Sequence, residues 1–395
     1  MLWSFVIWIG IAVGVLSLGF TYLNMRLVRT MGLSPTRKKA ARAGLAAMFL
    51  VPVLSMFLFR FMEGWGGAWA WIVYVGLGLL SLLFTAVVAR DLLLLGLKGY
   101  ERLASLLSSR RRAQPDPSRR AFLLQTSNLA VLGLAGILTT YGVYEARRRP
   151  GIVELVIPIQ RLPEAFNGFR IIQITDIHAG LTVKRGWIET IAQQVQDLKP
   201  DLVALTGDLV DGSVRHLRNE VAPLGELVAP AGKFFVTGNH EYYSGAEPWV
   251  NEAERMGYNV LLNAHQLIVR NGSAIVLAGV TDSSGGNFLS HHASDPAKAV
   301  AGAPADAVKI LLAHQPRSLY SALPLGFDLQ LSGHTHGGQF FPWNLLATIG
   351  QPYIAGLHKR ENTWIYVSRG TGYWGPPVRL AARSEITVIT LTNKT

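Results

Sequence analysis

Acidic residues and histidines gather in five short motifs in the second half of the chain. The motifs are Asp176-Ile177-His178, Gly207-Asp208-Leu209-Val210-Asp211, Gly238-Asn239-His240-Glu241, His314 alone, and Gly333-His334-Thr335-His336. Each motif alone is a common strand end or turn, but five of the ten histidines fall into this one ordered pattern. Asp, Asn and His supply the oxygen and nitrogen atoms that bind divalent transition metals. The sequence has no cysteine, which excludes a thiolate metal site and a cysteine nucleophile.

These donors suit the hydrolysis of a phosphate ester. Two cations a few ångströms apart neutralise the phosphate oxygens and lower the pKa of a shared water, so that hydroxide becomes available. Such a pair needs a bridging carboxylate, and Asp208, on a tight turn after a glycine, is the natural bridge. We expect the remaining donors to complete two sites: Asp176, His178 and His336 the first, and Asn239, His314 and His334 the second.

Three further residues have expected roles around these sites. His334 and His336, separated by one residue on an extended segment, would point the same way and reach two neighbouring metals. His240 would face the substrate and stabilise or protonate the departing oxygen. Asp211 would orient a neighbour or the turn. The mixed imidazole and carboxylate set suits manganese, iron or zinc and does not choose among them.

Short apolar runs precede the motifs and predict the elements that position them. The runs are residues 169–175, 202–206, 234–237, 310–313 and 327–332. Between the first two, Ile188, Ile191, Val195 and Leu198 recur at spacings of three and four, which predicts a helix packed on a sheet. Alternating strands and helices indicate an α/β domain, with the metal-binding side chains at the carboxyl ends of its strands.

In this order the motifs resemble the calcineurin-like metallophosphoesterase superfamily, from about residue 169 to the C-terminus. Gly333-His334-Thr335-His336-Gly337-Gly338-Gln339 and Ser368-Arg369-Gly370 are similar to its bacterial, membrane-associated phosphodiesterase branch. The resemblance implies a four-layer α/β/β/α metallophosphoesterase sandwich, a binuclear metal centre and the ligand roles given above. It also implies substrates such as lipid-linked phosphates or a nucleotide-sugar lipid pyrophosphate, which some relatives hydrolyse at the membrane.

The excess of positive charge lies in the first part of the chain. The formal net charge is +12, and residues 1–150 hold 18 of the 37 Lys and Arg but 5 of the 25 Asp and Glu. A nucleic-acid surface on the later domain therefore has no support. Four apolar stretches, 2–23, 43–62, 69–88 and 122–144, approach the ~20 residues that a helix needs to cross a bilayer. We expect a four-helix transmembrane anchor over 1–150 and a metallophosphoesterase catalytic domain over 151–395.

The distribution of basic residues predicts the orientation in a bacterial cytoplasmic membrane. The connections after the first and third stretches are basic, whereas the second holds only Arg60 and Glu63. The basic connections would be cytoplasmic loops, which places the catalytic domain on the outer face. Arg147, Arg148 and Arg149 oppose this arrangement. Residues 118–123, with Arg119 and Arg120, look like a twin-arginine export signal, and the alternative is an ordinary basic flank of a helix.

The expected function is metal-dependent hydrolysis of phosphomono- or phosphodiesters at the membrane, with a lipid-linked substrate favoured. Two alternatives stay open. The domain could lie on the cytoplasmic face and cleave a nucleotide-lipid pyrophosphate, or it could be a non-catalytic membrane scaffold with a phosphoesterase-like binding domain. Absence of one of the metal-binding residues would favour the scaffold function, and all seven expected metal-binding residues are present in the sequence. An aromatic group is expected in the core or, alternatively, in lipid: Phe340, Phe341, Trp343, Tyr373 and Trp374.

Overall fold

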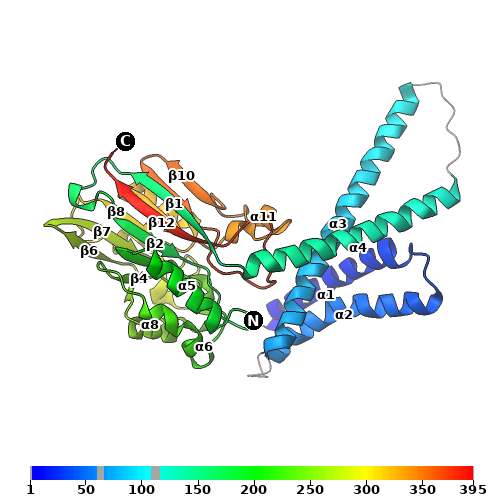
Figure 1. Cartoon of the computed structure of the whole chain (residues 1–395), viewed down its shortest axis with the longest axis horizontal. Coiled ribbons are helices and arrows are strands. Elements are labelled where there is room, and N and C mark those ends of the chain that lie inside the picture. Colours follow the sequence, from blue (N-terminus) through cyan, green and yellow to red (C-terminus); the bar gives the residue numbers. More distant parts are fainter. Residues whose placement is uncertain (1, 60–65, 108–115, 395) are drawn as a thin grey trace. The chain divides into compact units, whose positions relative to one another are not determined.

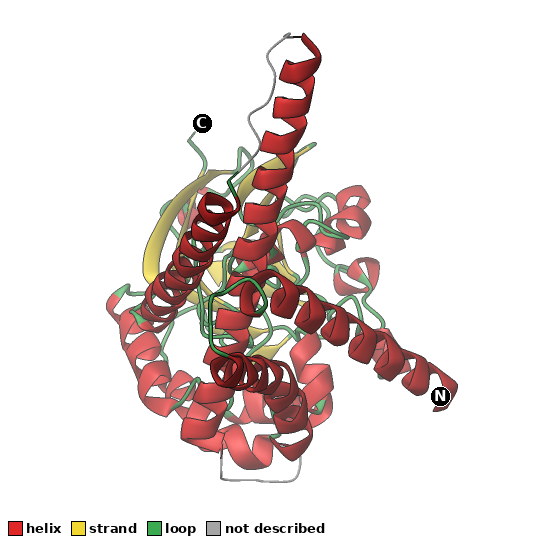
Figure 2. Cartoon of the chain, turned by 90° about the vertical axis from the view of Figure 1, so that its right-hand side faces the viewer, coloured by secondary structure: helices red, strands yellow, loops and turns green. Residues whose placement is uncertain are grey.

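The computed structural model describes residues 2–59, 66–107 and 116–394 of the chain. The chain divides into two compact units, Met1–Val143 and Tyr144–Thr395. In the described part of the first unit the regular structure is helical, whereas the second unit contains all the described strands (Figure 1, Figure 2). The two units therefore have different architectures.

The described residues of the first unit form four long helices and one π-helical turn. Its small core includes Leu27, Leu45, Leu83 and Val87, which lie on three different segments. The elements are α1 (Leu2–Leu23), η1 (Asn24–Val28), α2 (Pro35–Phe59), α3 (Gly66–Leu107) and α4 (Pro117–Arg147), which continues into the second unit.

Among the described residues, two helical stretches are long and apolar enough to cross a membrane, whereas four were expected. They are Gly67–Leu106 and Pro117–Arg147, and a shorter apolar segment is Val13–Val28. The prediction of four spans is corrected accordingly. Basic residues occupy the start of α2, so only residues 43–59 of it are free of charge, fewer than the ~20 that a span needs.

The predicted third loop also differs from the structure. Helix α3 does not end near residue 88 but continues to Leu107, so Arg90, Lys98 and Arg102 lie on the helix and not in a loop. Other residues of the predicted spans and connections lie outside the described part of the chain: Arg60, Met62, Glu63, Arg110, Arg111 and Arg112.

The second unit contains two six-stranded sheets of mixed strand direction. The first has the order β1 (Gly151–Pro158), β12 (Glu385–Thr392), β2 (Arg170–Ile174), β3 (Leu202–Leu205), β4 (Lys233–Phe235), β5 (Asn259–Val260). The second has the order β10 (Gly356–Arg360), β11 (Thr363–Val367), β9 (Leu329–Ser332), β8 (Lys309–Leu312), β7 (Ser273–Gly279), β6 (Ala264–Arg270).

Helices and short turns connect these strands. The α-helices are α5 (Arg185–Asp197), α6 (Val214–Val221), α7 (Asn239–Ser244), α8 (Ala246–Arg255), α9 (Pro296–Ala299), α10 (Leu319–Ala322) and α11 (Trp343–Leu346). The 3-10 turns are η2 (Glu164–Phe166), η3 (Ala222–Glu226), η4 (Gly285–Asn287), η5 (Ser290–His292), η6 (Pro316–Ser318), η7 (Leu323–Leu325) and η8 (His336–Gly338).

The two sheets pack face to face, with helices on their outer faces. One core cluster joins Ile171 and Phe234 of the first sheet to Leu277 and Leu331 of the second. On the other face of the first sheet, residues such as Ile188 of α5 complete a second cluster. A third cluster joins β7 and β8 to the short helices α9 and α10. The α/β prediction is confirmed, with two mixed sheets and covering helices.

The strands that precede the motifs end side by side. Ile174, Leu205 and Phe235 are paired across β2, β3 and β4, and Leu312 is paired with Leu331 across β8 and β9. The predicted runs match these strands to within two residues at each end, and the predicted helix is α5. Because these strands are parallel within each sheet, their carboxyl ends bring the motifs to one edge.

Candidate metal centre

The polar motifs of both sheets meet at this edge. The side chain of Gln173, at the end of β2, donates a hydrogen bond of 3.0 Å to the carbonyl of Ser332, at the end of β9. The backbone N–H of His334 donates to the carboxylate of Asp176 at 2.9 Å. These bonds hold the carboxyl ends of the two sheets together, so that residues about 160 positions apart in sequence share one site.

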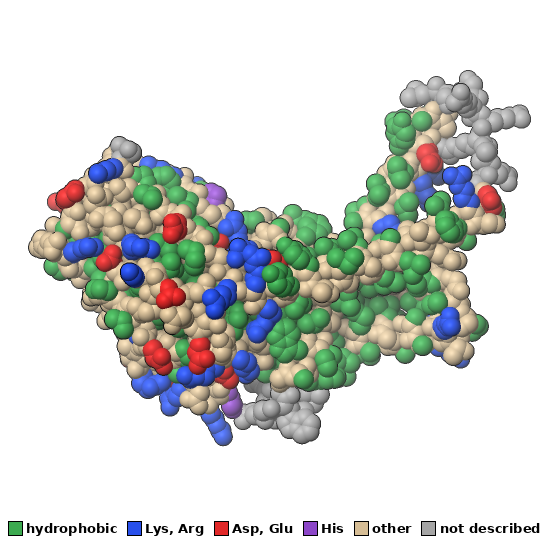
Figure 3. Space-filling view, viewed as in Figure 1, with side chains coloured by type: hydrophobic (Ala, Val, Ile, Leu, Met, Phe, Trp, Pro, Cys, Tyr) green, Lys and Arg blue, Asp and Glu red, His purple; other side chains and the backbone are tan. Residues whose placement is uncertain are grey.

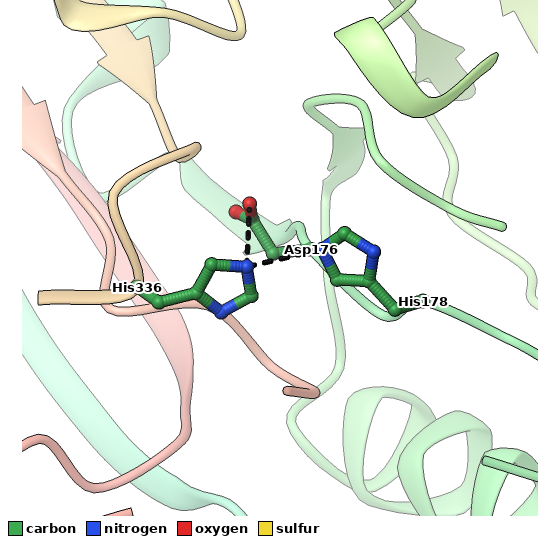
Figure 4. A group of neighbouring side chains, drawn as sticks. All are labelled: Asp176, His178 and His336. Carbon is green, nitrogen blue, oxygen red and sulfur yellow. Dashed lines mark hydrogen bonds and ion pairs between the residues drawn. The ribbon is translucent and has the colours of Figure 1, made fainter. Parts of the chain in front are cut away.

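Asp176, His178 and His336 form the first group of potential ligands (Figure 4). The Nε2 atoms of the two histidines are 3.0 Å apart, and His336 Nε2 lies 3.4 Å from Asp176 Oδ1. All three residues are buried. Burial raises the pKa of Asp176, and burial together with the neighbouring His178 and Arg379 lowers the pKa of His336 well below its ordinary value.

Asp208 lies at the centre of the second group. Its Oδ2 atom is 3.1 Å from His314 Nε2 and 3.8 Å from His178 Nε2, so it faces histidines of both groups. His334 Nδ1 lies 3.3 Å from His314 Nε2. Burial opposes ionisation of Asp208, but the attraction and hydrogen bond of His314 hold the pKa of its carboxyl well below the usual range. Asp208 is thus an anion between two clusters of imidazole nitrogens.

The backbone of the site is bent into unusual conformations. Asp176, His178, Asp208, His334 and His336 all have positive φ angles, between 51° and 72°. Such conformations cost free energy for residues other than glycine, and they cluster at functional sites. The prediction that His334 and His336 lie on an extended segment is therefore wrong. The two histidines reach different groups because the backbone adopts positive φ angles at both residues.

Glycines allow the close approach of these turns. A Cβ atom on Gly207, whose φ is +88°, would lie 2.8 Å from His314 Nδ1. A Cβ atom on Gly333 would lie 2.2 Å from Asp176 Oδ2. Both contacts are closer than real Cβ atoms make. Each glycine of these motifs thus leaves room for a potential ligand of the neighbouring motif.

His240 lies at the rim of the site and is fixed by Asp211. The Oδ1 atom of Asp211 accepts hydrogen bonds from His240 Nδ1 at 2.5 Å and from His178 Nδ1 at 3.0 Å. This geometry agrees with the expectation that Asp211 orients a neighbour. Burial alone would lower the pKa of His240, but the bond to Asp211 and the charge of Asp208 raise it to about 9. His240 Nε2 remains 4.0 Å from Asp208 Oδ2.

Glu241 supports the site in a way that the sequence did not indicate. Its fully buried carboxylate accepts hydrogen bonds from the backbone N–H groups of Gly238 at 2.6 Å, Leu209 at 2.8 Å and Asp208 at 3.0 Å. The side chain therefore ties the β3 turn to the β4 turn. Its position in the Gly-Asn-His-Glu motif was visible, but nothing local showed which backbone groups it would meet.

Arg379 is a second supporting residue that was missed. It is fully buried, and its Nη2 atom donates to His336 Nδ1 at 3.1 Å and to the carbonyl of Arg369 at 2.8 Å. Its Nη1 atom donates to the carbonyl of Ala382 at 2.6 Å. No sequence signal distinguishes this arginine, because its contact with the site, the ring of His336, lies 43 residues away along the chain.

The donor atoms fit divalent cations. Asn239 Oδ1 is buried and has no hydrogen-bond partner among the described residues, and a metal ion would satisfy it. His314 Nδ1 donates to the carbonyl of Thr206 at 2.8 Å, and its Nε2 atom, which faces Asp208, is the nitrogen at which a metal would take the place of the proton. Burial lowers the pKa of His334 to about 3, so its ring is neutral. The Nε2 atoms of His178 and His336 face each other at 3.0 Å, and both could serve as ligands of a cation.

The structure brings together the eight residues singled out from the sequence. Asp176, His178, Asp208, His240, His314, His334 and His336 appear in three overlapping groups with donor atoms within 4.8 Å of one another. Asn239 is the first residue of α7, directly before His240. The predicted aromatic group divides: Phe340 and Tyr373 are buried, whereas Phe341, Trp343 and Trp374 are about half exposed.

Comparison with known proteins agrees with this site. The sequence profile of the calcineurin-like phosphoesterases matches residues 169–338. A transmembrane protein with metallophosphoesterase domain from Danio rerio is 39% identical over 299 residues, which cover 73% of this chain and 68% of that protein. An uncharacterized metallophosphoesterase of Helicobacter pylori is 38% identical over 282 residues, covering 70% and 73%. The uncharacterized metallophosphoesterase YkuE of Bacillus subtilis is 32% identical over 270 residues, covering 65% and 92%.

The matched profile spans the five motifs, from the start of β2 through His336. The relatives share more than 30% identity over most of their own length. The chain therefore belongs to the calcineurin-like metallophosphoesterases and is a hydrolase of phosphoester bonds.

Proposed function

We propose that the site is a binuclear metal centre. Asp208 is the bridging ligand, and one observation above all supports this role: its carboxylate faces histidines of both groups. The first metal would be held by Asp176, His178 and His336, and the second by Asn239, His314 and His334. The donor set suits manganese, iron or zinc. When bound, the metals neutralise the phosphate oxygens and lower the pKa of a coordinated water.

The residues of the chain have separate tasks in this proposal. Asp211 fixes the ring of His240 through Nδ1, which leaves Nε2 directed toward the cluster. From this position His240 would hold a proton close to the departing oxygen of the ester and transfer it as the bond breaks. Glu241 and Arg379 would keep the ligand-bearing turns in place. His240 would therefore affect turnover more than metal binding.

We further propose that residues 1–150 anchor the catalytic domain, residues 151–395, in a bacterial cytoplasmic membrane. Large apolar side chains such as Leu18, Ile72 and Ile137 are more than half exposed on the helices of the first unit. Hydrophobic side chains gather over this unit in Figure 3. Exposed apolar surface on this scale is unusual in a protein surrounded by water. The Danio rerio relative is also named a transmembrane protein.

The substrate we propose is a phosphomono- or phosphodiester at the membrane, with a lipid-linked phosphate favoured because of the anchor. The basic residues beside the helices favour a multi-pass arrangement with the catalytic domain on the outer face. Arg119 and Arg120, in the first turn of α4, would serve as the twin-arginine-like signal for that export. Neither the side of the membrane nor the lipid character of the substrate affects the proposed chemistry.

Hydrolysis by the full chain in detergent micelles tests the catalytic proposal. The substrates are a chromogenic phosphodiester and the matching monoester, assayed before chelation, after removal of the chelated metal, and after return of manganese, iron or zinc. We expect chelation to abolish hydrolysis and at least one of the metals to restore it. Full activity of metal-free protein would contradict the proposal.

A further inference from the structure

An exposed apolar segment borders the metal centre. Five large apolar side chains lie within nine residues around α11, and each is about half exposed or more: Phe341, Trp343, Leu345, Leu346 and Ile349, whose exposure reaches 75%. Trp374, on another loop, is 55% exposed. We call these six residues the apolar rim. An exposed group of this size marks a site of interaction more often than ordinary surface.

Hydrogen bonds attach the rim to the catalytic site. The side chain of Gln339 donates to the carbonyls of Trp374 at 3.0 Å and Pro376 at 2.9 Å, and it accepts from the Trp374 N–H at 3.0 Å. It therefore joins the α11 segment to the loop of Trp374. The ring of Trp374 lies 5.6 Å from the ring of His240. The rim is thus part of the border of the metal centre.

The same edge of the second unit receives the chain from helix α4. Ala146, in the last turn of α4, is fully buried in a core cluster that also contains Val183 and Tyr373. Arg147 Nη1 and the Tyr373 hydroxyl both donate to the carbonyl of Thr182, at 3.5 Å and 3.4 Å. Tyr373 is the neighbour of Trp374. The segment that could cross a membrane therefore enters the catalytic unit beside the apolar rim.

The connection at this point is short and basic. Helix α4 ends at Arg147 and β1 begins at Gly151, so the linking residues can span at most about 14 Å. Arg147 and Arg149 are exposed. Basic side chains beside an apolar surface match the phosphates and acyl chains of an anionic lipid layer. The bilayer is thus the partner that fits the rim, because its chemistry matches these side chains and the short link keeps the catalytic unit close to the helix that could cross it.

We propose that the apolar rim inserts into the lipid bilayer at the border of the metal centre. The catalytic unit then contacts the membrane through its own surface, in addition to the helices, and the border of the metal centre lies at the lipid surface. The inference rests on the proposed membrane anchor but needs no catalytic activity. A second copy of the chain, or protein packed over the rim, would be a different occupant.

Site-directed spin labelling tests this surface directly, because the natural chain has no cysteine. The full chain carries one label at Leu345→Cys or at Ile349→Cys, with Val228→Cys as the control. Val228 is 67% exposed and lies far along the chain from the rim. Each protein is reconstituted into vesicles of phosphatidylethanolamine and phosphatidylglycerol. Collisions of the label with oxygen, which enters lipid, are compared with collisions with a nickel chelate, which stays in water.

Insertion predicts that the oxygen-to-nickel collision ratio at both rim positions exceeds the ratio at Val228 severalfold. A ratio equal to that of Val228 would show a rim in water and overturn the inference. Low collisions with both reagents would show a rim covered by protein, which also overturns it. Since the labels report on immersion alone, an inactive metal centre and a rim outside the lipid give separate results.

Discussion

At the scale of the residue, the site depends on the proposed metal ligands and also on supporting side chains that hydrogen-bond the turns carrying those ligands. The five motifs could be recognised because each ligand follows an apolar run. Glu241 and Arg379 could not, since their contacts with Asp208 and His336 join residues more than 30 positions apart. The same limit applies to His334 and His336, because a sequence does not state the positive φ angles that separate them.

Replacing Glu241 by Gln should weaken metal binding without removing a ligand. The amide cannot accept all three backbone hydrogen bonds that the carboxylate accepts, so the turn of Asp208 loses its support. We expect metal affinity to fall by about 10- to 100-fold, as is usual for residues that orient ligands. Competition with a chelator measures it, with Glu247→Gln, on the exposed start of α8, as the matched control. Equal affinities in both variants would exclude this role.

Replacing His240 by Ala should separate turnover from metal binding. Loss of a general acid typically reduces the rate by about 10²- to 10⁴-fold. The metal content should stay at the level of the natural protein, since the presumed ligands remain. Turnover and metal content are measured on the same preparation, with the exposed His216→Ala as the control. A loss of metal in the His240 variant would identify this residue as a ligand instead.

At the scale of the element, short apolar runs predicted the strands that end at the site and hydrophobic periodicity predicted helix α5, because these segments bury one or both faces in the sheet core. Periodicity could not predict that β1 pairs with β12, whose residues are more than 230 positions away. The lengths of the first-unit helices were also misjudged. A basic residue ends an apolar run in the sequence, but it does not end a helix such as α3.

An ion-pair cluster on helix α8 gives a pH-dependent prediction. Glu252 is buried, and its carboxylate accepts hydrogen bonds from Arg255 at 2.5 Å and Arg218 of α6 at 3.1 Å. The bond to Arg255 lowers the pKa of Glu252. Because the pKa of Glu252 is lower in the folded state than in the unfolded state, the ionised carboxylate stabilises the fold at pH values above its unfolded pKa of about 4.5. This stabilisation is lost as the pH falls through the pKa of the folded state.

Glu252→Gln should therefore be less stable than the natural protein at pH 7, by about 1 kcal/mol or roughly 2–4 °C in melting temperature. The difference should shrink below pH 4. Thermal unfolding of both proteins across this pH range measures it, with Glu254→Gln, an exposed neighbour on α8, as the control. A difference that stays constant with pH would mean that the ion pairs are not its cause.

At the scale of the whole molecule, the chain joins a helical unit with exposed apolar side chains to a calcineurin-like phosphoesterase domain. The charge excess of residues 1–150 was assigned correctly to the helical part from composition alone. The number of spans was not. The charges at the start of α2 leave only residues 43–59 of it uncharged, and the apolar segment of the first helix is the short Val13–Val28. The apolar surface of the remaining helices is the basis of the membrane attachment that we propose.

Alkaline carbonate washing of membranes that contain the full chain tests this attachment. Spanning helices stay in the bilayer at high pH, whereas a protein bound through its basic residues is released as electrostatic contacts fail. We expect the chain to remain in the membrane pellet. Release into the supernatant, with a known spanning protein retained in the same sample, would refute the anchor.

Metal content of the purified full chain is the most direct measurement of the central claim. The natural protein and Asp208→Ala are loaded with manganese, washed and analysed for bound metal, with the exposed Asp197→Ala as the matched control. A bridging Asp208 predicts two ions in the natural protein and in the control, and weakened binding of both in Asp208→Ala together with loss of hydrolysis. Two ions and full activity in Asp208→Ala would contradict the binuclear centre.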